Sequence, residues 1–172
     1  RLWSMEGQGA VSLWTSRLQS RGVSATVSEA QDLMLICFNR YEKFERVDMG
    51  DFNWVTPDFL AFASPQHQPV EPIPVNTPEY NALPTTISEI SSSKLPMPFK
   101  NVLAHFHQRN VGLVVRLNSE LYCPSYFTAM GIAHIDMIFE DGTCPPLQLV
   151  RRFIKMAHEM ITIKKKGIAV HC

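Results

Sequence analysis

The chain has 172 residues, of which 45% are hydrophobic and 19% charged, with 16 basic and 16 acidic side chains. This length suits one domain, or one domain with part of another, and the composition excludes a chain that is disordered throughout. The balanced charge gives no indication of a nucleic acid or a membrane surface as partner. No apolar run reaches the roughly 18 residues of a membrane span, and residues 1–10 lack the pattern of a secretory signal.

Residues 1–37 show no pattern to which we assign a function or a family. From residue 38 the pattern becomes more regular, with strand-like runs at residues 54–55 and 59–62 on either side of a turn at Pro57 and Asp58. Six prolines then fall between Pro65 and Pro84. Because proline removes a hydrogen-bond donor and restricts the residue before it, we expect residues 65–97 to form an extended linker arm without helix or central strand.

Helices and buried strands alternate in the second half of the chain. Phe99, Val102, Leu103 and Phe106 follow helical spacing, so a helix is predicted to end near residue 110. Apolar runs at residues 112–117, 132–139 and 168–170 predict three strands, and a long helix is predicted between the last two, over residues 150–161, with Gly167 just past its lysine-rich end. This order predicts an α/β fold with a parallel sheet flanked by helices.

The last predicted strand ends in His171 and Cys172. A cysteine at the carboxyl end of a strand in an open α/β sheet lies where such folds place their ligand sites. A phosphate can bind the backbone N–H groups of a loop and helix N-terminus that follow such a cysteine, and the same dipole activates its thiolate. The alternative is that a cysteine ending a strand only packs in the core.

Asp141 lies in the loop of residues 140–146, one predicted helix before Cys172. A carboxyl on a loop facing a thiolate is suited to protonate the leaving oxygen of a phosphate ester. The alternative is that Asp141 and Gly142 form an ordinary turn. Arg116 is predicted to make a structural salt bridge, and His134 and Asp136, which share one side of a strand, are predicted to be structural as well.

No metal site and no cofactor are predicted. The four cysteines, Cys37, Cys123, Cys144 and Cys172, are widely spaced without a C-x-x-C pair, which argues against a zinc module or a disulfide framework and favours a reducing compartment. His105 and His107 are two apart on a predicted helix and point to different sides, so they do not share a metal ion.

Six strings occur in the order in which one family has them. They are YEKFERV (41–47), GDFNW (50–54), FKNVL (99–103), VRLN (115–118), DGT (141–143) and GIAVHC (167–172). From about residue 38 to residue 172 the chain resembles the mitotic-exit, cell-division-cycle dual-specificity protein phosphatases, and around the proline-rich arm it is most similar to their filamentous-fungal branch.

The resemblance implies two tandem phosphatase-like domains, of which the first lacks chemistry. Residues 38–64 would be the tail of that first domain, residues 65–97 the linker, and residues 98–172 the beginning of the catalytic domain. Cys172 matches the nucleophile and Asp141 the general acid. The acidic side of the substrate groove is matched by Glu42, Glu45 and Asp51.

The family acts on phosphorylated proteins and prefers phosphoserine followed by proline with a basic residue nearby, as at sites of cyclin-dependent kinases. No cofactor, nucleic acid or membrane is implied, and the locations implied are nucleus, nucleolus, cytoplasm and spindle pole. From the residues alone, Glu42 and Glu45 would share one face of a helical turn. Lys43 and Arg46 could instead neutralise them as a solvated charged face.

The sequence departs from the family pattern at both ends. Residues 1–37 do not resemble the first domain, and no x-x-G-x-x-R string follows Cys172, so the phosphate-binding loop, its arginine and the next helix are missing. We therefore expect a polypeptide of these 172 residues alone to be inactive. Two alternatives stay open beside the enzyme: a fragment that binds phosphopeptides without turnover, and a truncated product without function of its own.

Overall fold

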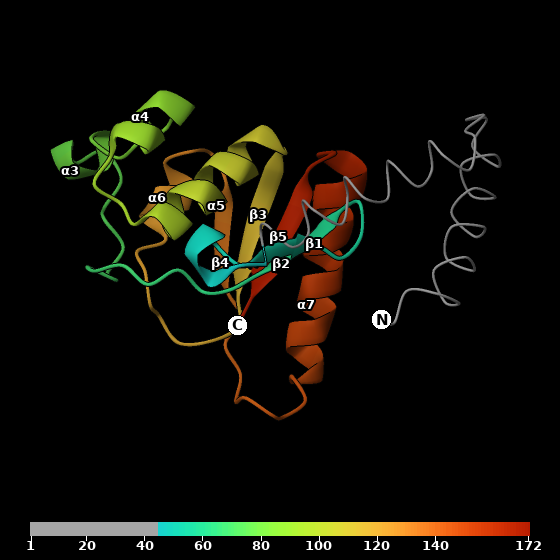
Figure 1. Ribbon diagram of the computed structural model, residues 1–172. Coiled ribbons are helices and arrows are strands. Elements are labelled where there is room, and N and C mark those ends of the chain that lie inside the picture. Colours follow the sequence, from blue (N-terminus) through green and yellow to red (C-terminus); the bar gives the residue numbers. More distant parts are fainter. Residues whose placement is uncertain (1–44) are drawn as a thin grey trace, which may run out of the picture. The chain divides into compact units, whose positions relative to one another are not determined.

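Five strands form a single sheet in the order β1-β2-β5-β3-β4, shown in Figure 1. This computed structural model describes residues 45–172, so the expectations for residues 1–44 lie outside it. β2, β5, β3 and β4 are mutually parallel, while β1 runs antiparallel to β2 at one edge. The strands are β1 (Phe52–Trp54), β2 (Phe59–Phe62), β3 (Val111–Arg116), β4 (Ala133–Asp136) and β5 (Gly167–His171). The predicted α/β fold with a parallel sheet is confirmed.

The helices lie between these strands along the chain. They are the short 3-10 helix η1 (Val47–Met49), then α3 (Pro78–Asn81), α4 (Ile87–Ser92), α5 (Met97–Gln108), α6 (Ser125–Thr128), α7 (Leu147–His158) and a π-helical continuation of α7, η2 (Glu159–Ile163). The two long helices predicted from apolar spacing correspond to α5 and α7. Lys165, at φ 54°, is the left-handed residue beyond η2, whereas Gly167, expected past the helix end, begins β5.

The proline-rich stretch contradicts the expectation of an arm without helix. Thr77 caps α3, and Pro78 takes its first position, where the missing N–H costs nothing. In α4 the Thr86 hydroxyl accepts from the Glu89 N–H while the Glu89 carboxylate accepts from the Thr86 N–H, which is a capping box. The N–H groups of Thr85 and Thr86 lower the pKa of Glu89 to about 2. The expectation that residues 65–97 contain no helix was therefore wrong, and Ile90 at 1% exposure anchors this segment in the core. Its role as a linker between two domains stays a prediction.

The first two strands belong to the same sheet as the rest. The Val55 N–H and the Thr56 N–H donate to the Phe59 carbonyl at the predicted turn, which closes the β1–β2 hairpin. β2 pairs with β5 over its whole length, from Phe59 opposite Ile168 to Phe62 opposite His171. A structural division at residue 64 is therefore absent from the described residues. The origin of residues 38–64 in a preceding phosphatase-like domain stays a prediction.

The two faces of the sheet carry separate hydrophobic cores. Alternating residues along β3 and β5 point to opposite sides, so that Val114 and Ala169 join the core under α5, and Val115 and Ile168 join the core under α7. The core under α5 is rich in phenylalanine, including Phe99 and Phe106 of the helix itself. Within residues 45–172, no helix is long and apolar enough to cross a lipid bilayer.

Candidate active site

Four parallel strands end together at one edge of the sheet. The register aligns Phe62 of β2 with His171 of β5, His171 with Arg116 of β3, and Arg116 with Asp136 of β4. Cys172 follows His171 directly, so its thiol stands at the carboxyl end of β5, the central strand. Open α/β sheets bind ligands at this edge.

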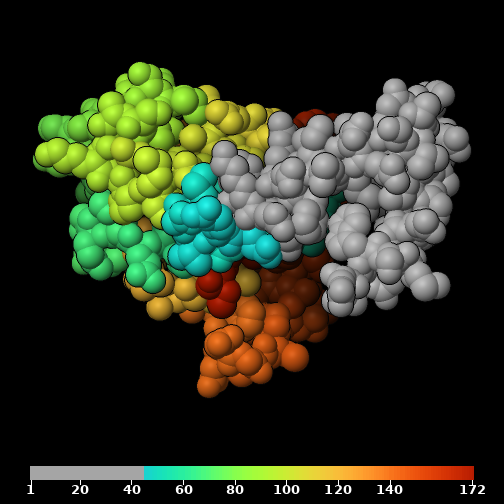
Figure 2. Space-filling view, viewed as in Figure 1, coloured from blue at the N-terminus to red at the C-terminus, as the bar shows by residue number. Residues whose placement is uncertain are grey.

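Cys172 is a free cysteine and exposed to solvent. Figure 2 shows the red C-terminal end of the chain reaching the surface between the cyan segment near residues 45–55 and the orange loop before α7. In this view the segments that carry the predicted acid and part of the predicted acidic groove lie on either side of the C-terminal end.

The loop between β4 and α7 projects from the same edge, below the point marked C in Figure 1. It carries Asp141, which is exposed and whose Oδ1 accepts the N–H of Gly142 at 2.9 Å. Gly142 has φ 72°, and the Thr143 N–H donates to the Glu140 carbonyl at 3.2 Å. The loop is thus a tight turn, as one reading of the sequence proposed, and it leaves the Asp141 carboxylate at the surface near the edge where β5 ends.

The predicted acidic residues have different surroundings. Glu42 lies outside the described residues, and Glu45 is exposed. Arg46 pairs with Asp48, with Nη2 2.7 Å from Oδ2. Lys43 lies outside the described residues with Glu42, so the alternative of a locally neutralised charged face stays open. Asp51 is half-buried, at φ 46° directly after Gly50.

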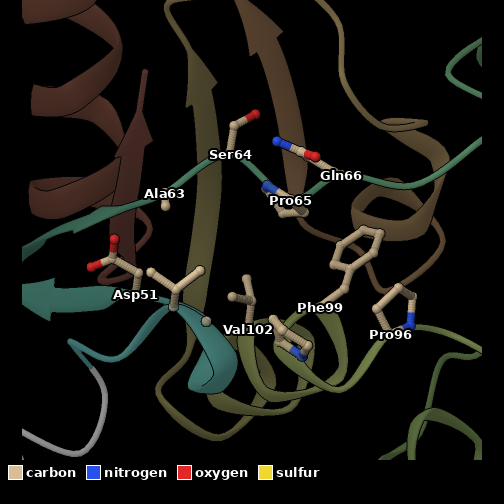
Figure 3. A pocket seen from close by; sticks show the side chains of 11 residues that line it. Asp51, Ala63, Ser64, Pro65, Gln66, Pro96, Phe99 and Val102 are labelled. Atoms are coloured by element: carbon tan, nitrogen blue, oxygen red, sulfur yellow. The ribbon is translucent and has the colours of Figure 1, made fainter.

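Asp51 borders a cavity of about 260 Å³ beside η1 and α5, seen from close by in Figure 3. The Ala63 N–H donates to the Asp51 carbonyl at 2.8 Å, which ties this residue to the end of β2. The cavity wall is mostly apolar, and the buried Ser64 hydroxyl in it has no hydrogen-bond partner among residues 45–172. The cavity is also lined by Val47, Gly50, Pro65, Gln66, Pro96, Pro98, Phe99 and Val102. An apolar hollow with one carboxylate at its border suits a side chain that is aliphatic along its stem and positive at its end.

An ion pair between a buried arginine and a partly exposed aspartate lies at this edge. Arg116 is 1% exposed, and its Nε and Nη2 donate to the two carboxylate oxygens of Asp136 at 2.7 and 2.9 Å. Its Nη1 donates to the Tyr122 carbonyl at 3.2 Å, and its guanidinium lies 5.2 Å from the centre of the Tyr122 ring. The predicted structural salt bridge of Arg116 is confirmed, with Asp136 as the partner.

Tyr122 joins two histidines that the sequence did not connect. Its hydroxyl lies 2.7 Å from Nε2 of His134 and 2.8 Å from Nε2 of His171. Burial lowers the pKa of His134 to about 4 and, with the neighbouring His134 and Arg116, lowers the pKa of His171 to about 3. Tyr122 and His171 are 49 residues apart, and the only local signal was the polar character of His171 at the end of an apolar strand.

Metal binding finds no support in residues 45–172, where no three His, Cys, Asp or Glu side chains are grouped so that they could hold an ion. His105 instead accepts the indole N–H of Trp54 at 2.9 Å. The chemistry available at the edge is therefore that of an exposed thiol, a surface carboxylate and a buried polar cluster.

Comparison with known proteins adds relatives over most of the chain, although no family model matches it. The chain is 78% identical over 132 residues to the tyrosine-protein phosphatase cdcA of Emericella nidulans, covering 77% of this chain and 22% of that protein. It is 48% identical over 143 residues to the tyrosine-protein phosphatase CDC14 of Saccharomyces cerevisiae, covering 82% of this chain and 23% of the yeast protein. For the human dual specificity protein phosphatase CDC14A the identity is 36% over 135 residues, covering 78% and 19%.

Among solved structures, a protein tyrosine phosphatase of Leishmania major matches with a TM-score of 0.39 and 21% identity, over 66% of this chain and 56% of that one. At that score the likeness supports no conclusion. The sequence identities support a conclusion. They fall from the Emericella protein to the Saccharomyces protein to the human protein, as expected for a member of the predicted fungal branch. The chain spans about a fifth of the length of these relatives, and it belongs to the family of the CDC14 tyrosine-protein phosphatases.

Proposed function

We propose that this protein is a phosphoprotein phosphatase that works through a phosphocysteine intermediate on Cys172. The observation that carries the proposal is the exposed thiol at the carboxyl end of the central strand. The names of the relatives, tyrosine-protein phosphatase and dual specificity protein phosphatase, support a phosphorylated side chain as the substrate. Phosphotyrosine, phosphoserine and phosphothreonine all fall within that class.

The reaction needs two transfers of the phosphoryl group. In the first, the Cys172 thiolate attacks phosphorus and the bond from phosphorus to the substrate oxygen breaks, while the Asp141 carboxyl gives its proton to that oxygen. In the second, water attacks the phosphocysteine, the sulfur leaves as thiolate, and the Asp141 carboxylate takes the proton from water. Inorganic phosphate and the free hydroxyl side chain are the products, and both enzyme groups return to their starting state.

The finer substrate preference is also a proposal. Glu45 and Asp51, together with Glu42, would attract a basic residue close to the phosphorylated one, and phosphoserine followed by proline would be preferred. The cavity beside Asp51 supports this, because it offers aliphatic and proline surface next to a carboxylate. The partners would then be proteins phosphorylated at sites of the cyclin-dependent-kinase type.

The first test uses the full-length protein and a phosphoserine-proline peptide with a downstream lysine. Cys172→Ser should abolish release of phosphate and leave peptide binding intact, because only the nucleophile is removed. Cys144→Ser is the matched control, since Cys144 is also free and exposed, and it should keep wild-type turnover. Turnover by Cys172→Ser, or its loss in Cys144→Ser alone, would refute the proposed nucleophile.

Asp141→Asn tests the acid. It should slow turnover about 10²–10⁴-fold for a substrate with a poorly leaving alcohol, and much less for an aryl phosphate that leaves without protonation. Equal slowing of both substrates would show that Asp141 has another role.

The acidic groove is tested by Glu45→Gln combined with Asp51→Asn. Asparagine tolerates the left-handed backbone of Asp51, so the charge is removed without strain. The Michaelis constant should rise about tenfold for a peptide with the lysine and stay unchanged for one with alanine there. Glu71→Gln, another exposed glutamate, should affect neither peptide. The expectation that a polypeptide of these 172 residues alone is inactive stays a prediction.

A further inference from the structure

The Tyr122 hydroxyl bridges the two histidines that flank β3 at the site edge. His134 of β4 and His171 of β5 each present Nε2 to it, at 2.7 and 2.8 Å. Tyr122 is 0% exposed, His171 is 2% exposed, and the side chain of His134 is 3% exposed. Both contacts have hydrogen-bond length, and water does not compete for either nitrogen.

A hydroxyl carries one hydrogen, so it can donate to only one of the two rings. To bond both, its oxygen must accept from the other ring, which must then carry hydrogen on Nε2. Burial keeps both imidazoles neutral near pH 7, since it lowers the pKa of His134 to about 4 and that of His171 to about 3. Each neutral ring has a single hydrogen, so the two rings must hold opposite tautomers.

This constraint reaches the nucleophile through the other nitrogen of His171. Nδ1 of His171 is buried and has no hydrogen-bond partner in the described residues, and the next residue is Cys172. If Nε2 of His171 accepts from Tyr122, Nδ1 carries hydrogen and is a donor. If Nε2 donates, Nδ1 is a bare acceptor. The field that His171 presents to the base of Cys172 therefore differs between the two tautomers.

The rings cannot easily turn away from these bonds. The His134 ring stacks on the Phe127 ring, with 6.0 Å between the ring centres and 24° between the ring planes. The His171 ring packs against the Phe62 ring, with 4.6 Å between the ring centres. The charged groups that face the cluster are Arg116 of β3 and Asp136 of β4, which neutralise each other, with Glu120 3.6 Å from the Arg116 guanidinium. Oδ1 of Asp136 is 3.7 Å from Nδ1 of His134, too long for a hydrogen bond, but its negative charge favours hydrogen on that nitrogen. Nε2 of His134 is then the acceptor of the Tyr122 hydrogen, and Tyr122 accepts from Nε2 of His171.

We propose that His134 is a positioning residue of the Cys172 site: through the single hydrogen of the Tyr122 hydroxyl it fixes which nitrogen of His171 carries hydrogen beside the nucleophile. The inference rests on the proposed function in so far as it treats Cys172 as the reacting thiol. The statement about tautomers stands on the geometry alone.

The first experiment measures the tautomers in the full-length protein by ¹⁵N NMR of labelled histidines at neutral pH. The His134 and His171 signals are assigned from the His134→Gln and His171→Gln variants. We expect one ring with its hydrogen on Nδ1 and the other with its hydrogen on Nε2. The same tautomer in both rings, or an even mixture in either, would overturn the proposal.

The second experiment measures how fast iodoacetamide alkylates Cys172, followed on its own peptide by mass spectrometry, at mildly acidic and at alkaline pH. His134→Phe keeps a flat ring on Phe127 but has no nitrogen, so Tyr122 is free either to donate to His171 or to accept from it. The ratio of the two rates should then change about threefold or more, and the His171 tautomers should become mixed. His134→Gln offers Tyr122 both an amide N–H and an amide oxygen, so it also leaves the direction of that bond unset, and the ratio should change in the same direction as in His134→Phe.

The matched control is His105→Gln. His105 is another partly buried histidine whose pKa burial lowers to about 4, but it bonds Trp54 and not Tyr122. It should leave both the Cys172 ratio and the His171 signal unchanged. An unchanged ratio in His134→Phe, or an equal change in His105→Gln, would reduce His134 to a packing role. If His134→Phe does not fold, the tautomers of the wild-type protein still decide the question.

Failure of the proposed function would look different. If Cys172 of the wild-type protein reacts as slowly as an ordinary thiol and the protein shows no turnover, the assignment of Cys172 as the nucleophile is refuted. The opposite tautomers of His134 and His171 would still be found in that case. Normal turnover together with the same tautomer in both rings would instead support the proposed phosphatase function and refute the inference about His134.

Discussion

The hydrophobic cores on the two faces of the sheet differ in their side chains. Under α5 the core is rich in phenylalanine, and it continues into the polar cluster around Tyr122. Under α7 the fully buried core is smaller and mainly aliphatic, and it adjoins an apolar cavity of about 200 Å³ between Leu117, Phe139 and Phe153. A cavity also borders the α5 side, about 260 Å³ beside Phe99 and Val102, but only the α5 face carries the polar cluster that positions the site edge.

Lowering the pH should have the largest effect on stability, and that effect should come from the α5 side of the sheet. The three described histidines with a shifted pKa lie on the α5 side, with values of about 4 for His105 and His134 and about 3 for His171, chiefly because of burial. A lowered pKa in the folded state means that the unfolded state binds more protons below pH 6.5, so stability is complete above that pH and is lost as the pH falls toward 4. Each histidine should cost roughly 1 kcal/mol per pH unit in this window.

The measurement is urea unfolding at a series of pH values from about 7.5 to 4. His105→Gln should make the decline shallower by about one third of its slope. A free energy of unfolding that stays flat between these pH values would show that the histidines are not held neutral. A decline that begins only below pH 4.5 would assign it to carboxylates instead.

The next largest effect should come from deleting one aromatic ring on each face. Phe106 is 0% exposed and lies edge-on against Phe62 at 5.0 Å, so Phe106→Ala should cost about 3–5 kcal/mol. Phe153 of α7 is only half-buried and borders the cavity, so Phe153→Ala should cost about 1–2 kcal/mol. Equal losses in urea unfolding would mean that the two faces are equally packed.

These aromatics also show what the sequence could predict. The spacing from Phe99 to Phe106 defined α5, because burial on one helix face leaves a periodic pattern. The apolar run of residues 112–117 defined β3, because burial on both sheet faces leaves a continuous apolar run. The prolines of residues 65–97 were misinterpreted, since Pro78 stands at a helix start, where proline is favoured. The position of Cys172 was predictable from strand order, and the relatives agree with the family identified from short strings.

The polar cluster could not be predicted in the same way. Tyr122 belongs to an irregular segment without periodicity, and only the parallel order of β4, β3 and β5 brings His134 and His171 to its hydroxyl. Such contacts depend on topology and on side-chain reach rather than on local pattern. Arg116 and Asp136 were each recognised as structural, but their pairing required the register of β3 against β4.

Two arginine–aspartate pairs of nearly identical geometry sharpen the contrast between the buried edge and the surface. Asp136→Ala should cost about 3 kcal/mol, because it leaves the guanidinium of Arg116 buried without its carboxylate. Asp48→Ala removes the same two bonds from Arg46, which is fully exposed, and should change the unfolding midpoint little. Similar losses in both variants would show that solvent reaches Arg116.

The smallest effect should come from adding one methylene to each face. Val150 of α7 borders the cavity, so Val150→Ile can place its extra carbon in empty apolar space and should stabilise the protein by about 0.5–1 kcal/mol. Val114 is 0% exposed within the dense core under α5, so Val114→Ile should overpack it and cost about 1–3 kcal/mol. Opposite signs in urea unfolding would confirm that the two faces differ in packing. Stabilisation by both variants would mean that the core around Val114 also holds unfilled space, in addition to the cavity that borders Phe99 and Val102.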